Sequence, residues 1–431
     1  MNIAVIGAGA AGLMAAARAA IAARLSGIEC HVVVLEKNRK AGVKILMSGG
    51  TRCNLTHDCG PDGIMEAFGR GGAFLRQALA ALPPIEVVRL FNSLGVATQI
   101  ESTGKVFPTS NRAVDVRDAL LQYAIDSGAE VRLDCAVRSV KRDPQSSGFL
   151  LEVGVDFLPF DRVIVTVGGK SWPGCGTIGE GYKWLQEFGH TIIPPRPALV
   201  PLVGGTDWMH EISGVTLDSV TASVWAAPQE GKKPPKKPLL ARRGGFLFTH
   251  FGFSGPTAMD VSGIITAAAQ PQETRLTLDL IPDLTNDQMI RWVEDQRRGG
   301  GRRKVSAAIA ELVPRRLAEA VTDAAGATEV SFAELPRAKS DALVQSLKQL
   351  SLPVTGTRGF DKAEVTAGGV SLKEVDPRTM QSRIVPGLFI AGEILDLDGW
   401  IGGYNFQSAF STGLLAGTHA VTSEIEVACL K

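Results

Sequence analysis

Three glycines near the start of the chain have the spacing of a dinucleotide-binding loop. Gly7, Gly9 and Gly12 lie in the run GAGAAG. In such a loop the first glycine permits a tight turn, the second lets the backbone approach a pyrophosphate, and the third lets a helix pack closely on a strand. Glu36 follows further on, where a carboxylate can accept hydrogen bonds from ribose hydroxyls. The spacing does not separate NAD from FAD.

The elements that must position these residues are also recognisable. Residues 2–6 (NIAVI) and 31–35 (HVVVL) are short apolar runs that predict buried strands, and the alanine-rich residues 13–24 predict a helix between them. The N-terminus of that helix would supply free N–H groups and a partial positive charge for phosphates. Strand, glycine turn, helix, strand and acid together predict a nucleotide-binding unit.

A second glycine-rich segment follows one connection later. Residues 48–54 read SGGTRCN, and we interpret them as a loop that wraps the pyrophosphate and ring of a cofactor, with an ordinary surface turn as the alternative. Cys53 lies in this loop without a partner cysteine at short spacing. We therefore expect an unreactive thiol that lines the pocket rather than a redox-active disulfide.

Two central segments are predicted to return to the same sheet. Residues 130–140 (EVRLDCAVRSV) alternate as one strand, in which the Val137 backbone could hydrogen-bond an adenine edge. Residues 160–167 form a buried strand that ends in Gly168-Gly169. Glycines at the carboxyl end of a sheet strand place the backbone beside the ligand crevice.

The C-terminal segment favours a flavin. A strand over residues 387–391 ends in Gly392-Glu393, and this carboxylate suits a ribityl chain, whose hydroxyls need an acceptor. Gly402-Gly403 then opens a long helix. Its N–H groups can face the O2/N1 side of a flavin, where negative charge collects on reduction. A glycine-rich turn before a packing helix is the alternative.

Changes in the pattern of apolar and polar residues along the chain predict a discontinuous α/β domain. Residues 198–285 are short alternating runs between Pro- and Gly-rich turns, typical of a small β-barrel, and residues 286–357 are helical. We therefore expect a doubly segmented domain, 1–197 with 358–431, that carries an inserted β-barrel-like domain at 198–285 and a helical subdomain at 286–357.

The net charge, the cysteine spacing and the length of the apolar runs argue against several classes of protein. The net charge of +1 provides no global field for nucleic acid or anionic membrane, and the six cysteines have no zinc spacing, so we expect no metal. No apolar run is long enough to cross a bilayer, and the chain enters a core strand at once without a leader, which predicts a cytoplasmic protein. The basic runs 232–238 and 297–304 are expected to be solvated loops rather than RNA contacts.

The order of these motifs resembles one family. GAGAAG (7–12), SGGTRCN (48–54), GGKSWP (168–173), LFTHFGFSGP (247–256) and AGEILDLDGWIGGYN (391–405) are similar to the bacterial HI0933-like or BaiN-like flavoproteins, described as NAD(P)/FAD-dependent oxidoreductases. The resemblance implies FAD, bound by a split Rossmann-type domain of the glutathione reductase kind, with an inserted β-barrel and a helical subdomain. Thr51 departs from the pattern, because many relatives have a third glycine there.

Together, the motifs and the resemblance imply a set of cofactor-binding residues that covers both ends of the chain. These residues are Gly7, Gly9, Ala10, Ala11, Gly12, Glu36, Lys37, Lys44, Ser48, Gly49, Arg52, Asn54, Val137, Gly168, Gly392, Glu393, Asp398, Gly403, Asn405 and Phe406.

Three activities remain open on this basis, since family members resemble bile-acid ene-reductases, an aminoketone oxidase and an enzyme that reduces a uridine in ribosomal RNA. The first is an NAD(P)H-driven reductase that passes hydride to an activated double bond. NAD(P)H would visit transiently, because the chain has no second dinucleotide fingerprint. The second is an amine oxidase that produces hydrogen peroxide, and the third is an rRNA uridine reductase.

A small-molecule substrate is expected, RNA is an alternative partner, and the sequence leaves the oligomeric state open. Catalytic groups are weakly indicated. His250 is the best titratable candidate in the insert, although a packed, hydrogen-bonded histidine is the more common state of such a residue. Tyr404 beside the flavin helix is the second candidate, and Cys53 the third.

Overall fold

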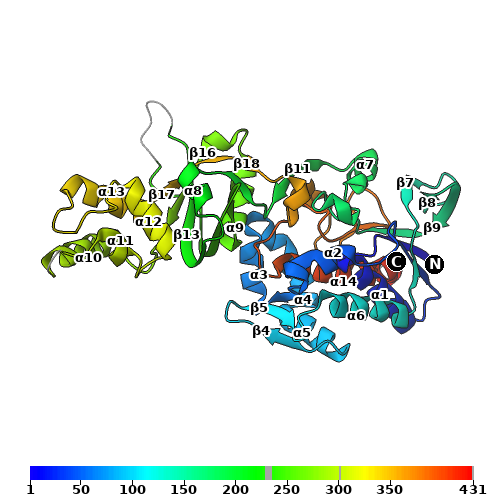
Figure 1. Ribbon diagram of the computed structural model, residues 1–431. Coiled ribbons are helices and arrows are strands. Elements are labelled where there is room, and N and C mark those ends of the chain that lie inside the picture. Colours follow the sequence, from blue (N-terminus) through cyan, green and yellow to red (C-terminus); the bar gives the residue numbers. More distant parts are fainter. Residues whose placement is uncertain (229–234, 300–301, 430–431) are drawn as a thin grey trace. The chain divides into compact units, whose positions relative to one another are not determined.

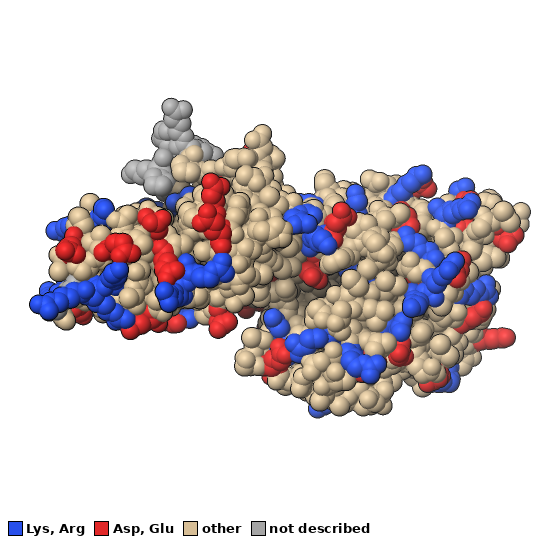
Figure 2. Space-filling view, viewed as in Figure 1, with Lys and Arg blue, Asp and Glu red and all other residues tan. Residues whose placement is uncertain are grey.

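The computed structural model describes residues 1–228, 235–299 and 302–429. The chain forms two compact units, Met1–Arg196 with Glu364–Lys431 and Pro197–Ala363. Figure 1 shows their elements, and Figure 2 shows lysine and arginine interspersed with aspartate and glutamate on the visible face of each unit. None of the helices in the described part of the chain is both long and apolar enough to cross a membrane.

The first unit is built on a five-stranded parallel sheet. Its strands lie in the order β20 (Leu388–Ile390), β10 (Arg162–Val165), β1 (Asn2–Ile6), β2 (His31–Leu35) and β6 (Glu130–Arg132). The strand from the C-terminal segment thus pairs within a sheet that begins at residue 2. This arrangement confirms the α/β fold expected from the sequence, with both segments of the chain in one sheet.

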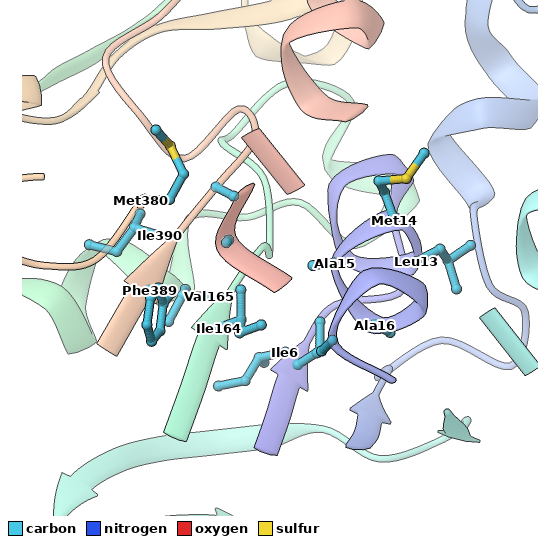
Figure 3. Close-up of a cluster of buried hydrophobic side chains, with 14 of the residues drawn as sticks. Ile6, Leu13, Met14, Ala15, Ala16, Ile164, Val165, Met380, Phe389 and Ile390 are labelled. Atoms are coloured by element: carbon cyan, nitrogen blue, oxygen red, sulfur yellow. The ribbon is translucent and has the colours of Figure 1, made fainter. Parts of the chain in front are cut away.

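Helices α1 (Ala10–Ser26) and α14 (Tyr404–Cys429) belong to the core of this unit. A side chain at Gly413 would meet the Ala11 carbonyl oxygen at 2.4 Å, and one at Gly417 would meet that of Ala15 at 2.1 Å. The two helices therefore touch backbone to backbone. Figure 3 shows Leu13 and Met14 of α1 with Ile164 and Phe389 of the sheet, all fully buried.

Smaller elements surround this core. They are α2 (Val43–Met47), α3 (Pro61–Ala67), α4 (Arg76–Ala81), α5 (Pro84–Ser93), α6 (Ala113–Ser127) and α7 (Glu180–Glu187), the sheet β3 (Thr56–His57), β5 (Lys105–Pro108), β4 (Thr98–Ile100), the sheet β7 (Val137–Arg142), β8 (Phe149–Val153), β9 (Asp156–Phe160), and the pair β11 (Ile192–Ala198) and β19 (Val365–Val370).

One expected strand is divided in two. Residues 130–140 were predicted as a single strand, but β6 joins the parallel sheet and β7 joins a separate antiparallel sheet. Asp134 lies between them with φ +54°, in the left-handed region that interrupts an extended strand. Val137 is therefore the first residue of β7, next to a break in its register with β8.

The second unit contains a seven-stranded sheet. Its order is β17 (Leu350–Leu352), β16 (Thr274–Asp279), β13 (Thr216–Ala226), β14 (Leu240–Thr249), β15 (Gly252–Ser254), β12 (Leu202–Gly204) and β18 (Val354–Thr357). The two outer strands are separated in sequence by Pro353 alone. Because one residue joins them, the end of β17 and the start of β18 lie beside each other at Pro353. The barrel-like form of the insert stays a prediction.

The helices of the insert differ from the expected separate subdomain. Helices α10 (Asn286–Arg298), α11 (Val305–Ile309), α12 (Arg315–Ala324) and α13 (Arg337–Lys348) share one hydrophobic core with the sheet and with α8 (Asp207–Glu211) and α9 (Pro256–Ala267). Leu278 of the sheet and Leu317 and Leu343 of the helices are fully buried members of this core. The insert is therefore one unit over residues 197–363, because its helices bury the apolar side of its sheet.

Candidate functional site

The glycine loop between β1 and α1 is packed on one side and open on the other. A side chain at Gly12 would lie 1.9 Å from the Gly7 carbonyl oxygen, and Gly7 itself has φ +98° with the Thr166 backbone 3.0 Å from its Cβ position. A side chain at Gly9 would meet nothing within 4 Å. The protein therefore requires Gly7 and Gly12 for its own packing, whereas the space at Gly9 is left for a ligand.

The first turn of α1 offers its backbone donors to that space. Ala10 and Ala11 begin the helix, Gly9 precedes it, and no side chain in the described structure caps this end or places an acid in its first turn. Uncapped N–H groups at a helix N-terminus favour an anionic group such as a phosphate.

Glu36 lies where the ribose of a dinucleotide would be held. Its side chain is 7% exposed, and one oxygen accepts a hydrogen bond from the Ala8 amide at 2.7 Å and the other from the Asn38 amide at 2.9 Å. Within the described residues no lysine or arginine pairs with it. A carboxylate can accept about four hydrogen bonds, so Glu36 retains capacity for ribose hydroxyls.

A partly buried ion pair, Lys44 with Glu393, joins the N-terminal and C-terminal parts of the site. Lys44 donates to the Ser171 hydroxyl at 2.5 Å and to Glu393, and Ser171 also donates to Glu393. The Thr366 amide donates to the same carboxylate at 3.0 Å. Glu393 is thus fixed at the carboxyl end of the parallel sheet. Ser171 and Thr366 were not among the site residues expected from the sequence, although Ser171 lies within the GGKSWP run.

Further charged residues of this region are Lys37, which has a carboxylate partner, and Glu364, whose pKa is raised. Lys37 forms an ion pair with Glu180. Burial raises the pKa of Glu364, an effect that the nearby positive charge of Lys44 opposes. Lys37 and Lys44, both expected to bind the cofactor, are therefore each paired with a carboxylate of the protein.

The SGGTRCN loop adopts a strained left-handed path. Gly49, Gly50, Thr51 and Cys53 all have positive φ, between 55° and 70°. This conformation favours glycine, so Thr51 adopts it at a cost in backbone strain that a glycine would avoid. The Ser48 hydroxyl bonds to the Ile45 carbonyl oxygen at 2.7 Å and helps to fix the start of the loop.

The three remaining side chains of this loop differ in their surroundings. Asn54 is 8% exposed, and its Oδ1 atom is buried without a hydrogen-bond partner. Cys53 is fully buried, which raises its pKa to about 12, so its thiol is inert at neutral pH. Arg52 bonds to Asn111 at 2.8 Å and Glu101 at 2.5 Å, so protein partners already hold it.

The start of α14 is clamped by strand β3. Gly402 and Gly403 have φ +133° and +93°, and a side chain at Gly403 would lie 2.5 Å from the Thr56 backbone. The Thr56 hydroxyl donates to buried Gln407 at 2.6 Å. No acidic residue occupies the first turn of α14. The helix end is therefore firmly positioned, with a polarity that suits negative charge.

His57 and Tyr404 complete this clamp. Their rings stack with centroids 4.8 Å apart and an interplanar angle of 18°, and His57 Nδ1 lies 3.1 Å from the Gly402 carbonyl oxygen. Burial lowers the pKa of His57. Trp400 meets Tyr404 edge-on at 6.0 Å. Thr56 and His57 were not expected from the sequence, in which their place shortly after the SGGTRCN loop is the signal that points to them.

The other C-terminal site residues mainly position their own loop. The Asn405 side chain accepts from the Gly399 amide at 2.9 Å and donates to the Gly399 carbonyl oxygen at 3.0 Å. Phe406 packs beside Phe410. Gly392 has φ +80°, and a side chain there would lie 2.8 Å from the Cβ atom of Ala11. The C-terminal glycine thus packs directly on α1.

Burial also perturbs acidic groups near this loop. It raises the pKa of Asp398 to about 6, with the positive charge of Arg196 opposing and the charge of Asp396 adding to the effect. Tyr182 is buried, and its hydroxyl has no hydrogen-bond partner. Gly168 has φ +75° and faces Thr177, whereas Val137 lies in the β7 sheet.

His250 lies in the second unit. It occupies the turn between β14 and β15, is exposed, and meets the ring of Phe251 edge-on at 5.1 Å. The packed state given as the more common alternative is therefore not found for this histidine.

The described residues of the first unit fit a dinucleotide. The open face at Gly9, the uncapped start of α1 and the unpartnered Asn54 oxygen all leave room or hydrogen-bonding capacity. No cluster of His, Cys, Asp and Glu within the described residues could hold a metal ion.

Comparison with known families decides the identity of this fold. A family model described as the HI0933-like protein Rossmann domain matches residues 1–419. The chain belongs to the HI0933-like family. This family binds FAD, and its members are flavin-dependent oxidoreductases, as is this chain.

Named relatives cover nearly the whole chain. It is 32% identical to the ribosomal RNA dihydrouridine synthase of Escherichia coli, over 95% of each chain, and 30% identical to the Haemophilus influenzae protein of the same name, again over 95% of each. It is 31% identical to the 3-dehydro-bile acid delta(4,6)-reductase of Clostridium scindens, over 97% of this chain and 98% of that protein.

Among solved structures, the chain is similar to a 3-ketosteroid-delta4-(5alpha)-dehydrogenase of Rhodococcus jostii. The TM-score is 0.49 and the identity 15%, over 97% of this chain and 96% of that chain. This similarity is too weak to support a functional conclusion.

Proposed function

We propose that this HI0933-like protein is an NAD(P)H-driven reductase of a carbon–carbon double bond conjugated to a carbonyl group. Relatives named as a dihydrouridine synthase and as a delta(4,6)-reductase support this class. The C5=C6 bond of uridine and the double bonds of a 3-oxo steroid are both conjugated to a carbonyl. The same reaction therefore covers both names.

The single structural observation that carries the proposal is the clamped start of α14. Thr56 and His57 hold Gly402 and Gly403 in place, and no acid lies in the first helical turn. An ordered, uncompensated helix N-terminus stabilises negative charge without reorganising. This is the feature that a reductase requires where its cofactor gains electrons.

The residues of the first unit would hold FAD along its length. Gly9, Ala10 and Ala11 would contact the pyrophosphate, Glu36 the ribose, and Asn54 and Glu393 the flavin half. Bound there, FAD would supply two-electron transfer between a nicotinamide and the substrate. Cys53 has no role in this scheme, because its thiol is buried and protonated at neutral pH.

Anaerobic reduction tests the proposal. Purified yellow protein is mixed with excess NADPH and then NADH, and the flavin absorbance is followed. Rapid bleaching by one nucleotide, followed by recovery of colour on addition of a 3-oxo-Δ4 steroid or of ribosomal RNA, is the expected result. Bleaching by dithionite but by neither nucleotide would contradict the proposal. Hydrogen peroxide formed from amines would then support the oxidase alternative.

A second, finer candidate is reduction of uridine in ribosomal RNA, favoured by the names of two relatives. Its electrostatic support is limited. In the run 297–304, whose residues 300 and 301 lie outside the described part, Arg303 pairs with Glu311 and Lys304 with Glu329. Residues 232–234 of the other basic run also lie outside the described part. The described residues show no partner for the Arg302 side chain.

Charge reversal distinguishes this candidate. If the run 297–304 contacts phosphates, the double substitution Arg302→Glu with Arg303→Glu should weaken RNA binding and lower its salt slope by about 2. Reduction of a 3-oxo steroid should not change. Unaltered RNA affinity and salt slope would remove this run from the RNA-binding surface.

A further inference from the structure

One peptide bond, between Gly402 and Gly403, comes directly before helix α14. This bond is trans, so its C=O and N–H groups point in opposite directions. The Gly402 carbonyl oxygen lies 3.1 Å from Nδ1 of His57, a residue of strand β3. The Gly403 N–H group therefore points away from His57, and within the described part of the chain it has no hydrogen-bond acceptor.

The orientation of this peptide depends on glycine at both positions. Gly402 has φ +133° and Gly403 has φ +93°, values that other residues rarely adopt. A side chain at Gly402 would lie 3.3 Å from His57 Nδ1 and 3.1 Å from a ring atom of Tyr404. Glycine backbone has many alternative conformations, so its surroundings must select one. Among the described residues, His57 supplies the one side-chain hydrogen bond to this peptide.

The same contact defines the protonation of His57. A carbonyl oxygen only accepts hydrogen bonds, so Nδ1 carries the hydrogen and donates it. Burial lowers the pKa of His57. The hydrogen bond to Gly402 and the charge of Asp58 oppose this effect, and the charge of Lys105 adds to it. The ring is therefore neutral above pH 7, with its hydrogen on Nδ1 and none on Nε2.

The ring of His57 is itself held in place. Tyr404 stacks on it with centroids 4.8 Å apart, and a side chain at Gly104 would lie 2.5 Å from Nε2. The Asp58 amide donates to the Gly104 carbonyl oxygen at 2.7 Å, which keeps this turn beside the strand of His57. A donor that is fixed beforehand orients its acceptor without reorganisation.

We propose that His57 is a positioning residue for the flavin, which orients the Gly402–Gly403 peptide so that the Gly403 N–H group faces the side of the ring where negative charge collects. His57 would thereby raise the reduction potential of bound FAD. The inference rests on the proposed function, in which the start of α14 lies beside the flavin, and it names the residue that controls this helix end. His57 acts through the peptide and does not itself touch the cofactor.

The expected effect is on the reduced state more than on the oxidised state. Without the hydrogen bond from His57 the peptide can rotate, because both of its residues are glycines. The negative charge of the reduced cofactor then loses one aligned donor, whereas the neutral oxidised ring loses little. The change should therefore appear in the potential and not in the FAD content.

Two variants separate the hydrogen bond from the ring. His57→Phe retains a ring to stack on Tyr404 but has no donor. His57→Asn has a side-chain amide that can donate to the Gly402 carbonyl oxygen from near the position of Nδ1. His31→Phe removes an exposed histidine elsewhere in the same unit and serves as the control. The potential of the holoenzyme is measured anaerobically at pH 8 with dithionite and reference dyes.

We expect His57→Phe to lower the equilibrium constant for two-electron reduction about tenfold, which makes the potential about 30 mV more negative. His57→Asn and His31→Phe should stay within about threefold of wild type, and so should the affinity of every variant for oxidised FAD. A purely structural role would instead weaken oxidised FAD binding and leave the potential unchanged.

Equal potentials for wild type and His57→Phe would overturn the proposal, as would a potential of His57→Asn as negative as that of His57→Phe. A second measurement needs no variant. Nitrogen NMR of the FAD-free wild type at pH 8 should show the Nδ1–H tautomer of His57, and the Nε2–H tautomer would contradict the hydrogen bond on which the inference depends.

Failure of the reductase function is a separate result. Dithionite reduces the flavin without a nicotinamide, so the potentials can be compared whatever the natural electron donor is. If the proposed function is wrong, NADPH and NADH would leave the wild type oxidised, whereas the potential of His57→Phe would still be more negative than that of wild type.

Discussion

The first turns of α1 and α14 are built in opposite ways, although the two helices pack against each other. At α1 a side chain on Gly9 would meet only open space. At α14 a side chain on Gly403 would collide with the Thr56 backbone, and His57 stacks on Tyr404. One helix end is left open by its own loop, and the other is closed on one side by a distant strand.

This difference separates local from long-range determinants of a binding site. The loop at α1 is set by residues within one strand–turn–helix unit. The clamp at α14 joins residues far apart, since Thr56 and Gln407 are 351 positions apart in sequence. The α1 end should therefore depend on individual glycines of its loop, whereas the side-chain contacts that hold the α14 end are shared among several residues.

The largest effect is expected at Gly12. Gly12→Val would place its Cβ atom 1.9 Å from the Gly7 carbonyl oxygen and 2.6 Å from the Thr166 hydroxyl, neither of which can move far. We expect a loss of about 3 kcal/mol or more in the free energy of unfolding, together with loss of bound FAD. Urea unfolding and flavin absorbance measure both. A variant that retains the wild-type midpoint would show that the loop is less closely packed than described.

Gly9→Ala sharpens the same point, because here the protein has no need for glycine. Gly9 has φ −80°, which alanine adopts without strain, and its Cβ position is empty. We expect wild-type stability of the FAD-free protein but an affinity for FAD lower by about tenfold to a hundredfold, roughly 1.4–2.8 kcal/mol. Fluorescence titration with FAD measures the affinity. Wild-type affinity would mean that the ligand does not approach Gly9.

The features of the first unit that depend on local sequence patterns were predictable, and those that depend on the three-dimensional fold were not. The parallel sheet, the glycine loop and Glu36 follow from local patterns, and the structure has them in place. The split of residues 130–140 could not be foreseen, because alternation continues through Asp134 while its positive φ interrupts the strand. His57 was missed for another reason: only the three-dimensional fold brings it to Tyr404.

The insert illustrates a further limit. Its strands and helices differ in texture, which suggested two parts, yet Leu278 and Leu317 lie in one core. The local pattern of apolar and polar residues indicates whether a segment is a helix or a strand. It does not indicate which other element buries its apolar side.

Asp398 provides a pH-dependent test of the α14 side. Burial raises its pKa from about 3.9 in the unfolded chain to about 6, so ionised Asp398 destabilises the folded protein. Both states are protonated below pH 4, the penalty develops as pH rises from about 4 to 6, and it stays constant above that. Asp398→Asn should therefore stabilise the FAD-free protein by about 1–2 kcal/mol at pH 7.5 and leave it unchanged near pH 4.

A carboxylate with the opposite shift is the control for Asp398. Hydrogen bonds from Arg378 lower the pKa of Asp376. Asp376→Asn should therefore destabilise the protein at neutral pH and have less effect as pH falls through the lowered pKa. Urea unfolding across pH measures both variants. Equal pH profiles for the two would refute the environments described for these carboxylates.

The smallest effect is expected at His57, where the clamp has several other contacts. His57→Phe retains a ring to stack on Tyr404 but loses the hydrogen bond to the Gly402 carbonyl oxygen, so a loss of about 0.5–1.5 kcal/mol is expected at pH 7.5. Because burial lowers the pKa of His57, the unfolded chain takes up the proton first, and wild type loses stability as pH falls below about 6.5. The cost of the substitution should therefore shrink at pH 5.5. His31→Phe, at an exposed histidine outside the clamp, is the matched control substitution. A cost that instead grows at low pH would mean that His57 is charged in the folded protein, and the α14 end would then resemble a charged site rather than a neutral clamp.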